Sequence, residues 1–139
     1  MTFKVDQLAE SVKAACPEAE FGFLFGSAKD GVLTTGADID VGLYVDTPHD
    51  FDLYNRAMEA VEKLAPGVEP DISVVTMDSD VVLRFEILKG RQLFVRNLET
   101  YLDFFSLTCR EYEDQMASYQ RQRRYRLEYA QRQKLSKNK

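Results

Sequence analysis

Three aspartates in this sequence have a spacing that predicts chemistry. Asp38 and Asp40 are two positions apart in a run that alternates polar and apolar residues. A strand there would turn both carboxylates to one face, about 6 to 7 Å apart. Asp71 opens a later apolar run, and it joins the pair if its strand lies beside the first. Because three carboxylates this close repel one another unless a cation lies between them, the pattern predicts a divalent metal site.

The ligand types indicate which metal and which reaction. Oxygen ligands without histidine or thiolate favour Mg²⁺ or Mn²⁺ and disfavour zinc. Two such ions about 3.5 to 4 Å apart would activate an attacking oxygen and stabilise a leaving pyrophosphate. Gly26 and Ser27 precede Asp38 by ten intervening residues. Glycine lets the backbone approach a phosphate, and the serine adds its hydroxyl and its amide if it begins a helix or tight turn, so the pair is a candidate triphosphate clamp.

Short strands must position these residues. The aromatic-rich run 21–25 is typical of a buried strand and ends at Gly26, and the polar segment 28–35 reads as a turn. Residues 38–45 alternate strictly, which predicts a second strand. Residues 71–77 predict a third strand, and 93–95 a short fourth one. The expected fold is an α/β arrangement with a small mixed sheet of three to four strands flanked by helices.

Helices account for most of the remaining chain. Apolar residues three or four apart predict amphipathic helices over 3–16 and 50–64, and a third helix capped by Asp78 or Ser79 and closed by Gly90. A long helix follows from residue 98, so we expect a core over 1–97 and a C-terminal helix with a basic tail over 98–139, within one domain. The positions expected to face inward on the last two helices are Val81, Val82, Phe85, Leu88, Leu98, Leu102, Phe105, Cys109, Tyr112, Met116 and Tyr119.

Other classes of site are excluded by the rest of the sequence. The single histidine, His49, follows Pro48 in a polar stretch, which argues against a Ser-His-Asp triad and against a zinc site. Cys16 and Cys109 are far apart and are expected to be buried thiols, not a disulfide or metal ligands. No apolar run approaches the roughly 20 residues of a membrane helix, and the first residues do not resemble a signal peptide, so the sequence predicts a cytoplasmic protein.

Charge is unevenly distributed along the 139 residues. Residues 1–120 hold 10 basic and 22 acidic side chains, whereas residues 121–139 hold 8 basic and one acidic. This division predicts an acidic body with a basic tail, which is either a solvated helix end, a frayed tail or a contact for a partner. RNA binding is disfavoured because Tyr125 and Tyr129 are isolated and do not form an interleaved stacking platform.

The order of Gly-Ser, ten residues, Asp-x-Asp and a later strand aspartate resembles the DNA polymerase beta-like nucleotidyltransferase superfamily. The resemblance covers about residues 3–110, including the segment Ile87-Leu88-Lys89-Gly90-Arg91. Within that superfamily, the short chain without a second domain is similar to the minimal nucleotidyltransferase (MNT) antitoxins that are paired with HEPN toxins. The resemblance therefore implies the polymerase beta-like nucleotidyltransferase fold.

The resemblance also implies a role for each residue of the motif. Asp38 and Asp40 are expected to bind both metal ions, and Asp71 to bind the catalytic one and help to deprotonate the attacking hydroxyl. Gly26 and Ser27 are expected to hold the nucleotide phosphates. Basic side chains could also approach the triphosphate, and the candidates are Lys29, Lys89 and Arg91.

For the MNT antitoxins, the resemblance implies transfer of AMP from ATP, with two Mg²⁺ ions, to a tyrosine of a HEPN ribonuclease, which silences the toxin. The expected partners are ATP and a HEPN-type toxin in a hetero-oligomer, with no membrane and no nucleic acid. Two alternatives stay open. One is a small-molecule nucleotidyltransferase of the aminoglycoside-modifying kind, which generally needs more sequence for a substrate pocket. The other is an antitoxin that occludes its toxin without catalysis.

Overall fold

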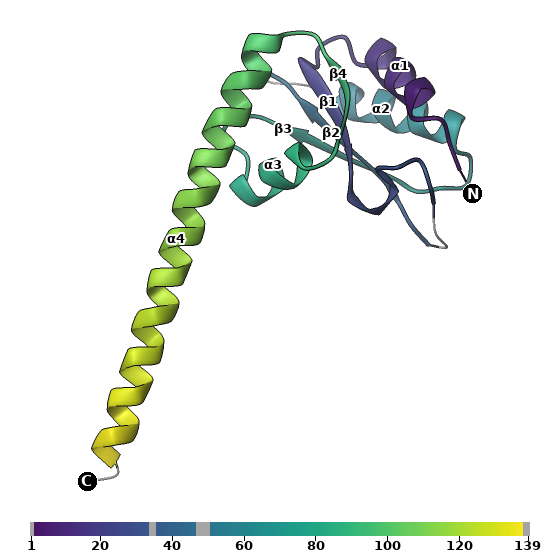
Figure 1. Cartoon of the computed structure of the whole chain (residues 1–139). Helices are drawn as coiled ribbons and strands as arrows, with labels where there is room; N and C mark the ends of the chain where they lie inside the picture. Colours follow the sequence, from purple (N-terminus) through teal and green to yellow (C-terminus); the bar gives the residue numbers. More distant parts are fainter. Residues whose placement is uncertain (1, 34–35, 47–50, 138–139) are drawn as a thin grey trace.

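The structure is a computed structural model that describes residues 2–33, 36–46 and 51–137. A four-stranded mixed sheet lies at its centre (Figure 1). The strands are β1 (Phe21–Phe25), β2 (Ile39–Tyr44), β3 (Pro70–Val75) and β4 (Arg91–Val95). Their order in the sheet is β3-β2-β1-β4. β1 is antiparallel to both of its neighbours, and β2 is parallel to β3. The mixed sheet and its flanking helices confirm the predicted fold class.

Two helices cover one face of the sheet. They are α1 (Val5–Ala15) and α2 (Phe51–Leu64), each within two residues of its predicted bounds. Alternation along β2 turns Ile39, Val41 and Leu43 toward them, where these side chains are fully buried. The same alternation leaves Asp40, Gly42 and Tyr44 on the opposite face. The apolar core therefore fixes which way the aspartates of β2 point.

The opposite face carries α3 (Val81–Leu88) and the start of α4 (Leu98–Lys137). Phe21 stacks on Tyr44 with ring centroids 4.9 Å apart, and the ring of Phe104 from α4 meets both edge-on at 5.1 Å. A Cβ atom at Gly42 would lie 2.8 Å from Cδ1 of Ile87, so the absence of a side chain there lets α3 lie close against the sheet. These contacts join α3 and α4 to the face that bears Asp40.

The predicted inward faces of α3 and α4 are wrong in part. The cap of α3 is Asp80, whose carboxylate accepts a hydrogen bond from the backbone N–H of Leu83, and not Asp78 or Ser79. Val82 is 38% exposed, whereas Arg84 is buried. On α4, the predicted inward positions Leu98, Leu102, Phe105 and Tyr119 are exposed, and the residues that are fully buried are Phe104 and Thr108. Each helix is therefore rotated relative to its apolar pattern.

α4 extends far past the rest of the fold. It is continuous to Lys137, so the basic segment is a helix and is not frayed over its described length (Figure 1). All the side chains described from 121 to 135 are exposed. No helix within the described ranges combines the length and the apolar character of a membrane span. Thr34 and Thr35 of the predicted turn, and His49, lie outside the described residues.

Candidate active site

The aspartates meet at one end of the sheet because of the pairing of β2 with β3. Asp40 and Asp71 are direct partners in the parallel register, and in-register side chains of neighbouring strands share a face. Asp38 immediately precedes β2, two positions from Asp40. Pro70 begins β3, so Asp71 belongs to the strand and not to the preceding loop. The structure thus places Asp40 beside Asp71, with Asp38 at the start of the same end of β2.

The environment of Asp40 shows how close these groups are. Burial raises the pKa of its carboxyl to about 6, and a hydrogen bond with Asp71 and the negative charges of Asp71 and Asp38 add to the increase. A cation bound between these carboxylates would offset their mutual repulsion and so favour the ionised form of Asp40. The three side chains therefore form an anionic cluster that a divalent cation would neutralise.

Gly26 lies directly against this cluster. It ends β1 opposite Asp40, since Phe25 is the register partner of Asp40, and it begins a single 3-10 turn over Gly26–Ala28. Its φ of +76° is in the left-handed region that favours glycine. A Cβ atom at this position would lie 3.1 Å from Cγ of Asp40 and would overlap its Oδ2. The backbone of Gly26 and the exposed Ser27 are therefore beside the carboxylates, where a triphosphate bound to the same cation would lie.

Two lysines border the same region. Lys29 and Lys89 line a small cavity of about 170 Å³ together with Gly26, Glu86 and Gly90. Lys89 is already paired with Glu86 at 2.8 Å, and its ammonium lies 5.5 Å from the ring centre of Phe85. Arg91 begins β4 beside Leu24 and does not line this cavity. Of the three basic candidates, Lys29 and Lys89 are the ones placed beside Gly26.

The donor set suits a hard cation. Asp38, Asp40 and Asp71 offer only carboxylate oxygens, which are the ligands that Mg²⁺ prefers. Among the described residues, no three His, Cys, Asp or Glu side chains converge closely enough to form a finished metal cage. Repulsion between carboxylates opposes such convergence without a cation between them. The chemistry of these oxygen ligands therefore fits Mg²⁺.

The model of the family described as "Polymerase beta, Nucleotidyltransferase" matches residues 7–99, which is about two thirds of the chain and includes the whole aspartate cluster. The chain belongs to this family. The match confirms the superfamily that the motif predicted. No curated protein matches the sequence of this nucleotidyltransferase.

Solved structures agree on the fold of the nucleotidyltransferase. A mutant toxin-antitoxin MntA-HpeT structure has a TM-score of 0.68 and 18% identity, over 84% of this chain and 93% of that chain. A tri-AMPylated Shewanella oneidensis HEPN toxin in complex with MNT antitoxin has a TM-score of 0.61 and 19% identity, over 84% and 89%. A toxin-antitoxin with AMP-PNP has a TM-score of 0.62 and 18% identity, over 84% and 93%.

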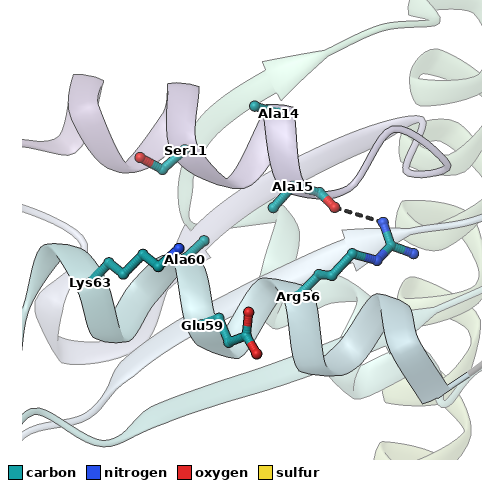
Figure 2. Close-up of a pocket in the computed structure, with 7 residues that line it drawn as sticks. All are labelled: Ser11, Ala14, Ala15, Arg56, Glu59, Ala60 and Lys63. Carbon is teal, nitrogen blue, oxygen red and sulfur yellow. Dashed lines mark hydrogen bonds between the residues drawn. The ribbon is translucent and has the colours of Figure 1, made fainter.

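Two other hollows of the nucleotidyltransferase lie on the α2 side of the sheet. One, of about 380 Å³, is formed by α1 and α2, and Figure 2 shows Arg56 in it donating a hydrogen bond to the carbonyl oxygen of Ala15 at 2.6 Å. Arg56 is also paired with Glu18. The other, of about 640 Å³, lies between Tyr54 and Met58 of α2 and the start of β3. Neither opens on the carboxylate face.

Arg84 of the nucleotidyltransferase has a structural role that the sequence did not predict. Only 2% exposed, it donates hydrogen bonds to the carbonyl oxygen of Ser79 at 2.9 Å and to Oγ1 of Thr108 at 3.1 Å, and it forms an ion pair with Glu111. It thereby connects α4 to α3 and to the loop that follows β3, the strand of Asp71. The sequence feature that could have indicated this role is the position of Arg84 among the apolar residues of the short helix α3.

Proposed function

We propose that this chain is an antitoxin nucleotidyltransferase that transfers AMP from ATP to a tyrosine of a HEPN ribonuclease toxin and so neutralises the toxin. The observation that carries the proposal is the pairing of Asp40 with Asp71, with Gly26 against Asp40, in a member of the polymerase beta nucleotidyltransferase family. Further support comes from structural neighbours that include a tri-AMPylated HEPN toxin bound to an MNT antitoxin and a toxin-antitoxin with AMP-PNP.

The nucleotide would be held by the end of β1. The absence of a side chain at Gly26 makes room for the Asp40 carboxylate, so that a phosphate at the exposed backbone of Gly26 would lie beside it, and Ser27 would contribute its hydroxyl and backbone amide. Lys29 borders the same cavity and would neutralise part of the triphosphate charge. Asp38, Asp40 and Asp71 would hold two Mg²⁺ ions. When bound, Mg²⁺ supplies neutralisation of these carboxylates and of the charge that develops on the leaving pyrophosphate.

The chemical step forms one bond and breaks one. The phenol oxygen of the acceptor tyrosine bonds to the α-phosphorus of ATP, and the bond from that phosphorus to the pyrophosphate oxygen breaks. The phenol has a pKa of about 10 in water, so its proton must be removed. Asp71 is suited to accept the proton because it is exposed and lies at the open edge of the cluster.

A protein acceptor suits the exposed position of Asp71, the residue proposed to accept the proton of the attacking hydroxyl. Asp71 lies on β3, which is at the edge of the sheet. A tyrosine presented by a folded partner would be positioned by that partner and would not need a deep pocket on this chain.

The test is transfer of labelled AMP from ATP, with Mg²⁺, to a HEPN ribonuclease of the kind found in the neighbouring toxin-antitoxin structures. The double variant Asp38→Asn, Asp40→Asn is compared with Glu59→Gln, which removes a carboxylate from α2 on the other face. We expect label on a toxin tyrosine with the wild type and with Glu59→Gln, and none with the double variant.

Neutralisation is assayed in parallel by toxin ribonuclease activity. If the double variant silences the toxin as well as the wild type does and no label is transferred, the enzymatic account fails and occlusion explains the antitoxin action. If label is transferred only to small hydroxyl compounds, the protein-acceptor account is wrong.

A further inference from the structure

The exposed side of α4 carries an apolar stripe that the fold leaves uncovered. Leu98, Leu102 and Phe105 are 63%, 50% and 43% exposed. Each residue turns a helix by about 100°, so these side chains project to one side of the buried face that bears Phe104 and Thr108. In the half that projects beyond the rest of the fold, Leu127 is also exposed, at 56%, but Gln122 and Arg123 separate it from Tyr119. The stripe formed by Leu98, Leu102 and Phe105 therefore lies in the first half of the helix.

The two halves of α4 carry opposite charges. Residues 98–114 contain five acidic side chains and one basic, and residues 121–137 contain seven basic and one acidic. The segment 115–120 between them has no charged residue. Glu113 and Asp114 on one side of the midpoint, and Arg123 and Arg124 on the other, are all exposed. α4 therefore has an acidic first half and a basic second half, and each half would attract the oppositely charged half of another such helix.

The second half of α4 has no support from the rest of the protein. Figure 1 shows it projecting away from the sheet and the other helices. Most of the stability of a helix in a folded protein comes from packing against a neighbour, whereas the side chains from 121 to 135 are all exposed. A second helix that lay along this half would supply that packing.

We propose that a second copy of this chain binds to the exposed side of α4, with the two α4 helices antiparallel. In that arrangement the acidic half of each helix lies along the basic half of the other, and the exposed apolar stripe of each first half lies along the projecting half that bears Leu127 of the other. The same patch is used on both copies, as a two-fold interface requires. A parallel pair would instead place Arg123 and Arg124 against their own counterparts, which is unfavourable.

The test uses charge reversal in the full-length chain, with mass measured by light scattering over a concentration series. Wild type should reach about twice its mass of 16.0 kDa, and added salt should shift it toward the monomer because the charged pairs are exposed. The variants Glu113→Arg, Asp114→Arg and Arg123→Glu, Arg124→Glu should each be monomeric at concentrations where the wild type is dimeric. Combining all four substitutions in one chain should restore the dimer. Circular dichroism confirms that each variant remains folded.

Three results would overturn the proposal. One is a wild type that stays monomeric at every concentration. Another is a charge-reversed pair that dimerises as well as the wild type, and a third is a folded fourfold variant that stays monomeric. Hydrogen exchange on α4 distinguishes a second copy of the chain from a HEPN protein as the partner. If residues 121–135 become protected only when a HEPN protein is added, and no dimer forms without it, the exposed side of α4 binds the HEPN protein and the dimer proposal is wrong.

Discussion

Gly26 and Asp40 touch across the β1–β2 pair, so closely that a Cβ atom at position 26 would overlap Oδ2 of the aspartate. The residue that follows β1 and the carboxylate of Asp40 on β2 are thus in direct contact. A phosphate that approaches the backbone of Gly26 is necessarily beside the carboxylate of Asp40. The Gly-Ser pair and the Asp-x-Asp pair are therefore not two motifs but two sides of one contact.

Replacing Gly26 with alanine should abolish transfer by displacing the carboxylate of Asp40. The substitution also places a side chain at a φ of +76°, which costs roughly 1 to 2 kcal/mol by itself. Gly67→Ala is the matched control, because Gly67 has a φ of +85° but has no atom within 4 Å of an added Cβ. We expect Gly67→Ala to lose a similar stability with full activity. Equal activities of the two variants, measured as AMP transfer, would contradict the contact.

Asp40→Asn should make the protein more stable without metal, and increasingly so as the pH rises. Burial and the neighbouring carboxylates raise the folded pKa from 3.8 to about 6, so the folded state holds its proton more tightly than the unfolded state. That stability is fully present below 3.8 and is lost as the pH rises through about 6. Asparagine cannot ionise, so the difference in Tm between variant and wild type should grow across this range.

Mg²⁺ provides the complementary measurement for Asp40. Added at a pH well above 6, it should raise the Tm of the wild type and not that of Asp40→Asn. A pH-independent difference between the two proteins would show that the carboxyl of Asp40 is not held near its neighbours.

Arg84→Met should loosen α4 from the sheet. The substitution removes the hydrogen bonds to Ser79 and Thr108 and the ion pair with Glu111, and we expect a loss of about 2 kcal/mol in the free energy of unfolding. Glu111→Gln should cost less than about 1 kcal/mol, because the Glu111 side chain is 41% exposed. Denaturant unfolding gives both values, and hydrogen exchange should rise in α3 and in residues 98–112. Equal costs for the two variants would contradict this assignment.

The two cysteines should differ in reactivity. Cys16 is fully buried, and burial raises its pKa to about 11, so its thiolate is scarce at neutral pH. Cys109 is partly exposed on α4. A thiol reagent should therefore label one cysteine in the native protein and two after unfolding, as counted by mass spectrometry. Rapid native labelling of Cys16 would mean that the core around α1 opens readily.

The strands and the aspartate cluster were predictable because strand alternation determines direction. Once Ile39 and Val41 are buried, Asp40 must point to the other face, and the prediction of β1, β2 and β4 was accurate to within two residues. The pairing of β2 with β3 does not follow from the sequence, because nothing local in it determines which strands are neighbours. It is the register that places Asp71 beside Asp40.

The helix faces were not predictable from the same pattern. α4 covers one side of a small sheet and buries a narrow line of residues, including Phe104 and the polar Thr108. More apolar residues lie on its exposed side, and a periodicity argument selects the face with more of them. Arg84 was missed for a related reason, because its charge suggests solvent, whereas three acceptors on neighbouring elements satisfy its guanidinium.

The strand order has a consequence for how the site can change. β2, which holds Asp40, is paired on both sides, whereas β3, which holds Asp71, is paired on one side only. Asp40 is thus held in the interior of the sheet, whereas Asp71 is carried by its margin. Under the proposed function, a substitution at Asp71 would remove the group that accepts the proton and leave the contact between Gly26 and Asp40 formed. Binding of ATP and its turnover would then be separable by one residue.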